Sequence, residues 1–100
     1  MNSAEEELTP GQREIARLAE DPKFREEALR AARHALWRHG LPETAAEDAY
    51  QSAILRLHKH FEKHETEGIK DLFGYSMMVV LNEARRFSER EKKRPQARQA

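Results

Sequence analysis

Residues 45–64, AAEDAYQSAILRLHKHFEKH, constrain the fold of this chain more than any other stretch. The segment contains no glycine or proline, and its apolar residues recur three or four positions apart, which is the spacing of one helix face. Polar and charged residues occupy the opposite side. The pattern predicts a helix with one face in a core and the other facing water or a partner. The predicted buried positions are Ala46, Ala49, Tyr50, Ala53, Ile54, Leu57 and Phe61.

Capping signals define the helices on either side of this segment. Thr9-Pro10 and Asp21-Pro22 each place a capping side chain before a proline at the first helical position. Gly40 is a predicted helix stop, because glycine adopts the left-handed conformation that often ends a helix. The expected helices cover residues 10–20, 22–39, 44–63 and 71–90.

The last of these helices begins with LFGYSMMVVL (72–81), which is apolar almost all round. MMVVL could form a strand, but Ala84 and Phe87 continue the pattern at helical spacing, which favours a helix. A helix of this kind is buried on more than one side or presents a second face to a partner. Gly74 predicts close packing there, since glycine inside a helix costs about 1 kcal/mol relative to alanine. Trp37, near the end of the expected helix over residues 22–39, is either half exposed or packed in the core, and we favour the core.

The chain of 100 residues is expected to form one all-α, four-helix domain over residues 9–90. Its net charge is zero, but the acidic and basic residues are unevenly distributed along the chain. Residues 1–21 hold six acids and two bases, whereas residues 85–98 hold seven bases and two acids. We expect an acidic flexible N-terminus over residues 1–8 and a basic flexible tail over residues 91–100.

Several functional classes find no support in the sequence. The chain has no cysteine, no glycine-rich phosphate loop and no recognisable nucleophile, so we expect a non-enzyme without a cofactor. No apolar run reaches the length of a membrane span and no signal peptide is visible, so we expect a cytoplasmic protein. His58, His60 and His64 could hold a metal, but they lack an obvious further ligand, and we expect solvated histidines and no metal.

Basic residues accumulate from Arg85 and Arg86 into the tail, and Tyr75 precedes them on the same predicted helix. An aromatic ring on which bases stack, with arginines on the backbone, is the combination that binds single-stranded DNA. A solvated helix end is the simpler interpretation of the same residues. The pattern therefore indicates either a nucleic-acid contact or a solvated helix end at these residues.

Two motifs resemble region 2 of bacterial sigma factors, particularly the extracytoplasmic-function group. AEDAYQSAILRLHKHF (46–61) is similar to region 2.2, which commonly reads A-E-D-L-V-Q-E-V-F-L-R-L-W-R. YSMMVVLNEA (75–84) is similar to the following motif, W-L-Y-R-I-A-R-N-E-A, and residues 22–39 fit region 2.1. The matching residues are Ala46, Glu47, Asp48, Gln51, Leu55, Arg56, Leu57, Asn82, Glu83 and Ala84.

The resemblance implies a transcription initiation module. In sigma factors region 2.2 binds the clamp helices of the RNA polymerase β′ subunit, so Asp48, Gln51 and Leu55 would face polymerase. No region 4, which reads the −35 element, follows in this sequence. We therefore expect a fragment, half of a split sigma factor whose partner supplies region 4, or a region-2-like protein that kept polymerase binding and lost promoter recognition.

The resemblance also implies contacts with the −10 element of promoter DNA. Tyr75 falls on the family's tryptophan and would help melt the duplex. The loop 62–71 would hold a flipped base of the single-stranded non-template strand, with Asn82 near that pocket, and Arg85 and Arg86 would touch the DNA backbone. Four acids in that loop are unfavourable for DNA. The alternative is therefore an all-helical interaction module or transcription regulator that binds a protein partner without recognising DNA. It would use the exposed face of the helix over residues 44–63, or dimerise through the apolar helix over residues 71–90.

Overall fold

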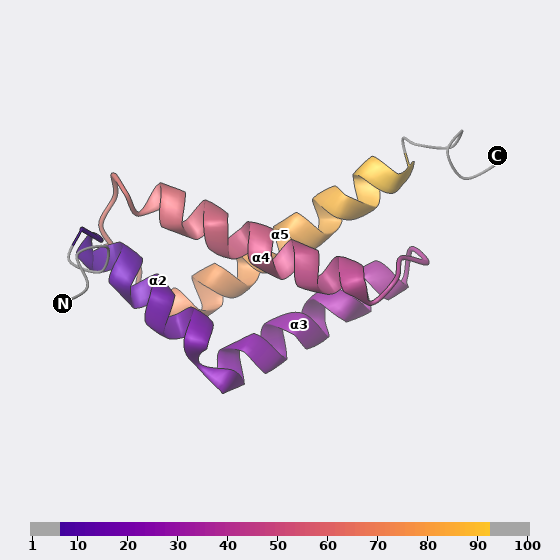
Figure 1. Ribbon diagram of the computed structural model, residues 1–100, viewed down its shortest axis with the longest axis horizontal. Coiled ribbons are helices and arrows are strands. Elements are labelled where there is room, and N and C mark those ends of the chain that lie inside the picture. Colours follow the sequence, from indigo (N-terminus) through magenta and orange to yellow (C-terminus); the bar gives the residue numbers. More distant parts are fainter. Residues whose placement is uncertain (1–6, 93–100) are drawn as a thin grey trace.

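The computed structural model describes residues 7–92, and within this range the chain forms helices and no strand. The prediction of an all-α chain with four helices is confirmed for these residues. Residues 1–6 and 93–100, which hold most of the expected flexible ends, lie outside the described range. The long helices α4 and α5 cross each other, and α2 and α3 pack against this pair (Figure 1). The helices are α2 (Pro10–Glu20), α3 (Pro22–Trp37), α4 (Thr44–His60) and α5 (Leu72–Lys92).

The start of α2 is held by a capping box that also joins it to α4. The Thr9 hydroxyl oxygen accepts from the Gln12 N–H at 3.1 Å, and the Gln12 side chain accepts from the Thr9 N–H at 3.0 Å. The same two side chains donate to α4, Thr9 to the Phe61 carbonyl at 2.7 Å and Gln12 to the His58 carbonyl at 2.9 Å. A local capping signal therefore also satisfies carbonyls at the end of another helix.

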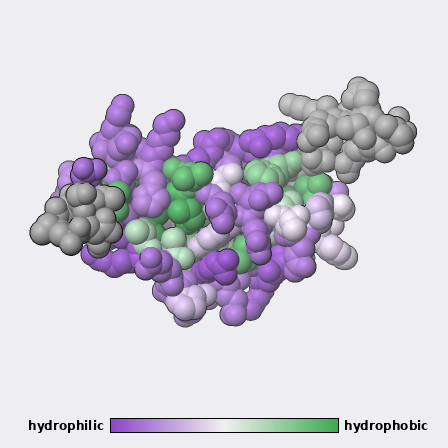
Figure 2. All heavy atoms as spheres, viewed as in Figure 1, coloured by the Kyte–Doolittle hydropathy of each residue, from purple (hydrophilic) through white to green (hydrophobic). Residues whose placement is uncertain are grey.

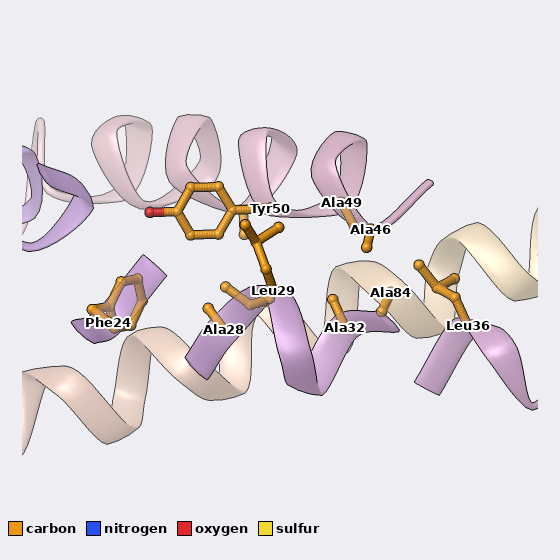
Figure 3. Close-up of a cluster of buried hydrophobic side chains, with 11 residues drawn as sticks. Phe24, Ala28, Leu29, Ala32, Leu36, Ala46, Ala49, Tyr50 and Ala84 are labelled. Carbon is orange, nitrogen blue, oxygen red and sulfur yellow. The ribbon is translucent and has the colours of Figure 1, made fainter. Parts of the chain in front are cut away.

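The main core lies where α3, α4 and α5 meet, and small side chains dominate it (Figure 3). Alanines on all three helices let the backbones approach closely, and the Phe24 ring fills one end, edge-on to Phe73 at 5.1 Å between centroids. The predicted stripe of α4 is buried apart from Ile54, which is half-buried. The cluster comprises Phe24, Ala28, Leu29, Ala32, Leu36, Ala46, Ala49, Tyr50, Ala53, Val80 and Ala84.

Tyr50 is the polar member of this core. Its hydroxyl donates to the Ala19 carbonyl at 3.2 Å, so α4 is tied to the end of α2 as well. Burial raises the pKa of Tyr50 above its usual 10.0, and the nearby Arg25 guanidinium partly opposes that rise. Tyr50 therefore stays neutral in the folded protein and serves as a hydrogen-bond donor.

A second, smaller core encloses Phe61, where the end of α4 meets α2. Phe61 is fully buried with Ile15 and Leu57. A Cβ atom on Gly11 would lie 3.0 Å from the Phe61 Cβ, so glycine allows the first turn of α2 to close against the ring. The helix ends at His60 and not at residue 63 as predicted, because the Gln12 side chain of α2 occupies the His58 carbonyl. In a continuing helix that carbonyl would accept from the Glu62 N–H, which donates to the Lys59 carbonyl instead.

The last helix, α5, differs from prediction at its start. The Asp71 carboxylate accepts from the Gly74 N–H at 3.0 Å and caps the helix. A Cβ on Gly74 would come 2.5 Å from an oxygen of the same Asp71 carboxylate, so the expected close packing is with the cap and not with another helix. Val80 is buried while Met78 is 55% exposed, so part of the apolar segment faces outward.

No helix in the described part of the chain combines the length and apolarity that membrane crossing requires.

The end of α3 also differs from prediction, and Trp37 lies outside the core. The Trp37 side chain is 74% exposed, whereas the neighbouring Leu36 is buried. Gly40, at φ +74°, closes the helix two residues earlier than expected. The Gly40 N–H donates to the Trp37 carbonyl at 2.9 Å and the Leu41 N–H to the Leu36 carbonyl at 3.2 Å, which is a Schellman motif.

We expect the substitution Gly40→Ala to lower the free energy of unfolding by about 1–2 kcal/mol, because alanine is strained in the left-handed region. A Cβ at Gly40 would meet no atom within 4 Å, so the loss would be conformational and not steric. Gly68→Ala is the matched control, since Gly68 also has open space but no positive φ. Urea denaturation of both variants measures the difference, and equal stabilities would contradict the assigned turn.

Candidate functional site

A groove between α4 and α5 collects most of the polar residues singled out from the sequence. The groove has a volume of about 240 Å³. On α5, the positions 75, 79, 82 and 86 are four, three and four apart, so they form one row along the helix. The lining residues are Arg56, Leu57 and His60 from α4, and Tyr75, Val79, Asn82, Glu83 and Arg86 from α5.

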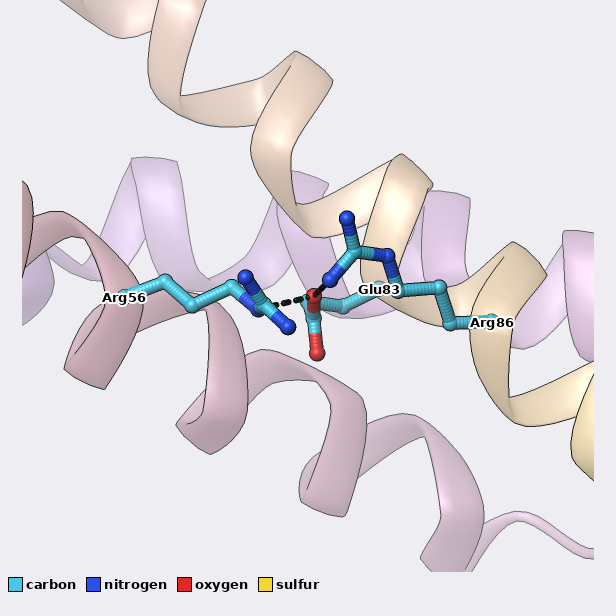
Figure 4. A network of polar contacts seen from close by, with 3 residues as sticks. All are labelled: Arg56, Glu83 and Arg86. Carbon is cyan, nitrogen blue, oxygen red and sulfur yellow. Dashed lines mark hydrogen bonds and ion pairs between the residues drawn. The ribbon is translucent and has the colours of Figure 1, made fainter.

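A buried carboxylate joins the two walls of the groove (Figure 4). The Glu83 side chain is only 3% exposed, and one of its oxygens lies 2.5 Å from Arg56 Nε and 3.4 Å from Arg86 Nη1. Both arginine side chains are 52% exposed. Two cations on one anion leave an excess positive charge at the groove, with further N–H donors free to bind a ligand oxygen.

The aromatic end of the groove is built around Tyr75, which is 36% exposed. Its ring centroid lies 6.2 Å from that of Phe61 and 6.3 Å from that of His60. His60 in turn stacks on His64, with centroids 4.4 Å apart and planes 18° from parallel. No group of three potential metal ligands comes together among the described residues. His60, stacked on His64, therefore lies beside the Tyr75 ring.

Of the four residues predicted to contact DNA, Tyr75, Asn82 and Arg86 line this groove and Arg85 does not. Successive residues on a helix point about 100° apart, so neighbouring arginines cannot share one groove. Arg85 lines a separate hollow between α3 and α5, together with His34.

The loop predicted to hold a flipped base forms a different pocket. Residues 62–67 pack against the start of α2 around a cavity of about 530 Å³, and Asn82 is not among its lining residues. The pocket carries four carboxylates, Glu14, Glu62, Glu65 and Glu67, and its basic lining residues are Lys63 and His64. Glu14 accepts a hydrogen bond from the Thr66 hydroxyl at 2.7 Å, which holds the loop to α2. The acidic lining makes this pocket a poor site for a phosphate backbone.

The outer face of α4 carries the three residues predicted to face polymerase. Asp48, Gln51 and Leu55 lie three and four positions apart and are all exposed. The Leu55 side chain is 69% exposed, which leaves a large apolar group in water beside two polar ones. On the face shown in Figure 2, hydrophilic residues predominate and hydrophobic ones are gathered in limited areas.

The pair formed by Arg56 and Glu83 was not predicted as part of a site. One signal was available, because Glu83 falls on the apolar stripe of its helix with Val80, Ala84 and Phe87. An acid at a buried position requires a cationic partner. The sequence does not reveal which cation, since Arg56 comes from another helix.

No protein-family model, no curated protein and no solved structure matches this chain.

Proposed function

We propose that this chain is a transcription initiation module similar to region 2 of sigma factors. In this proposal the outer face of α4 binds the clamp helices of the RNA polymerase β′ subunit, and the groove between α4 and α5 takes one strand of promoter −10 DNA. The observation that carries it is the groove, which brings Tyr75, Asn82 and Arg86 together.

The chemistry of the groove suits a single nucleic-acid strand. The exposed part of the Tyr75 ring offers a surface for base stacking, Asn82 offers both a donor and an acceptor, and Arg86 offers charge to a phosphate. Arg56 becomes a further candidate contact, because it shares Glu83 with Arg86 at the same groove. A duplex would have to open before a base could reach the ring.

Zero net charge argues that this chain holds DNA weakly alone. The proposal therefore includes help from polymerase and from a separate protein that supplies region 4. Arg85 remains a predicted backbone contact outside the groove.

We expect Tyr75→Ala to weaken binding of single-stranded −10 DNA by about 1–3 kcal/mol, the usual contribution of one base–aromatic stack. Fluorescence anisotropy with labelled promoter strands and core polymerase measures the affinity. Trp37→Ala is the matched control, because Trp37 is a more exposed aromatic residue on another helix. Equal affinities for the Tyr75 variant and the unchanged protein, or an equal loss for both variants, would exclude the groove as the DNA site.

The polymerase contact is tested separately. We expect Asp48→Arg combined with Gln51→Ala to weaken binding to the β′ clamp helices by about tenfold or more, as for central residues of an interface. Glu20→Arg is a control with the same change of charge at an exposed position on α2. Biolayer interferometry with a clamp-helix fragment gives the affinities, and circular dichroism confirms that the variants are folded. Unchanged binding by the folded double variant would remove the polymerase proposal.

A protein-binding module without DNA recognition is the second candidate. The exposed Leu55 on α4 and the acidic lining of the loop pocket favour it. This candidate predicts a normal complex with polymerase in which promoter DNA shows no protection and no permanganate reactivity around the −10 element. The sigma-like proposal predicts both signals.

A further inference from the structure

A second cleft lies at the turn between α3 and α4, and the proposed function does not use it. The cleft has a volume of about 410 Å³, with Trp37, Leu41 and Pro42 as its apolar wall. Arg30 and Arg33 line it as well. None of its lining residues belongs to the α4–α5 groove or to the outer face formed by Asp48, Gln51 and Leu55.

Trp37 dominates the apolar wall of this cleft. It is the chain's single tryptophan and the most exposed of its large hydrophobic side chains in the described part, at 74%. The Schellman hydrogen bonds of the Trp37 and Leu36 carbonyls hold the backbone of this turn in place. An exposed tryptophan on a fixed backbone, rimmed by arginines, has the composition of an interface hot spot.

Arg30 and Arg33 each form a long, exposed ion pair with a glutamate of the same chain. Arg30 lies 3.8 Å from Glu26 and Arg33 lies 3.8 Å from Glu43, and all four side chains are more than two-fifths exposed. Ion pairs this long and this exposed contribute little to stability, so a ligand carboxylate can displace either glutamate at small cost. Arginine also binds carboxylates in a bidentate geometry, which a new ligand could adopt here.

We propose that this cleft binds an acidic peptide segment of a partner protein, with an apolar side chain against Trp37 and carboxylates on Arg30 and Arg33. The apolar wall and the two basic residues match such a segment in hydropathy and in charge. A nucleic-acid strand fits less well, because it brings a phosphate with every nucleotide, whereas this cleft offers only two arginines beside Glu43 and a largely apolar wall. The inference is independent of the sigma-like proposal.

The test uses the intrinsic fluorescence of Trp37, since no other indole contributes. Short random peptides displayed on phage are selected on the full chain and counter-selected on the Trp37→Ala variant. The expected peptides carry Asp or Glu next to Leu, Phe or Trp. Each synthetic peptide free of tryptophan should shift the Trp37 emission to shorter wavelength in a saturable manner. Arg30→Ala combined with Arg33→Ala should weaken binding by about fivefold or more, whereas the control Arg17→Ala with Arg90→Ala should not.

Three results would overturn the proposal. The first is a selection that yields no peptide distinguishing the two proteins, or only peptides without acidic residues. The second is a stronger emission shift with a short oligothymidylate than with the selected peptides, which would assign the cleft to nucleic acid. The third is a shift that appears with rising protein concentration alone, together with dimers in light scattering, which would make a second copy of this chain the occupant.

Discussion

Phe61→Ala is expected to lower the free energy of unfolding by about 3–5 kcal/mol, the range for truncating a buried phenylalanine. The Phe61 ring is fully buried between Ile15 and Leu57. Gly11 comes so close to it that the backbone of α2 has little room to collapse into the cavity. Equilibrium urea denaturation followed by far-ultraviolet circular dichroism measures the loss.

Trp37→Ala provides the control for this prediction, because it removes a larger aromatic side chain from an exposed position. We expect its stability to change by no more than about 0.5 kcal/mol. Similar losses in the two variants, or a loss below about 1 kcal/mol for Phe61→Ala, would contradict the burial assigned to these residues. The ring centroids of Tyr75 and Phe61 lie 6.2 Å apart, so the Phe61 variant should also weaken the binding of any ligand in the α4–α5 groove.

The sequence predicts the helices of this chain well because their signals are local. Thr9 and Asp21 cap helices through bonds to residues two or three positions away, and Gly40 ends one through its own φ angle. The stripe of α4 is equally readable, since only one face of a helix can be buried against its neighbours. The last turns are less predictable, because side chains from the start of α2 bind the carbonyls at the end of α4, and no signal within α4 itself reveals those partners.

Trp37 shows that the apolar character of a residue does not by itself predict burial. It follows Leu36 directly, so it lies about 100° from the buried stripe of its helix. The prediction of a core residue used its chemical type and not its position on that stripe. The angular position would have indicated exposure, and exposure is what makes Trp37 a candidate for binding.

The groove was predictable in part. Tyr75, Asn82 and Arg86 are seven and four positions apart on one helix, so the sequence alone places them in a row. Arg56 belongs to another helix, and its ion pair with Glu83 depends on the axial offset and the rotation of α4 relative to α5. That register results from packing of the small core side chains, which no local pattern encodes.

The buried carboxylate leads to the second large effect. Arg56→Ala combined with Arg86→Ala should lower the free energy of unfolding by about 3 kcal/mol, because it leaves Glu83 buried without a cation. The value lies at the low end for a broken buried pair, since truncating two half-exposed arginines admits water. Glu83→Gln alone should cost less, because the two arginines left behind are already partly solvated.

The triple variant with Glu83→Gln, Arg56→Ala and Arg86→Ala decides the cause of this loss. Removing the stranded charge should restore part of the stability lost in the double variant, which thermal and urea denaturation would measure. A triple variant less stable than the double one would mean that the arginines act through packing of their alkyl chains instead.

The same residues require care in the DNA assays. Truncating the two arginines would unfold part of the protein, so a loss of DNA affinity could not be assigned to a lost contact. Arg56→Lys and Arg86→Lys keep a charge beside Glu83 while removing the planar guanidinium. A loss of DNA affinity in those folded variants would therefore report contact with the strand.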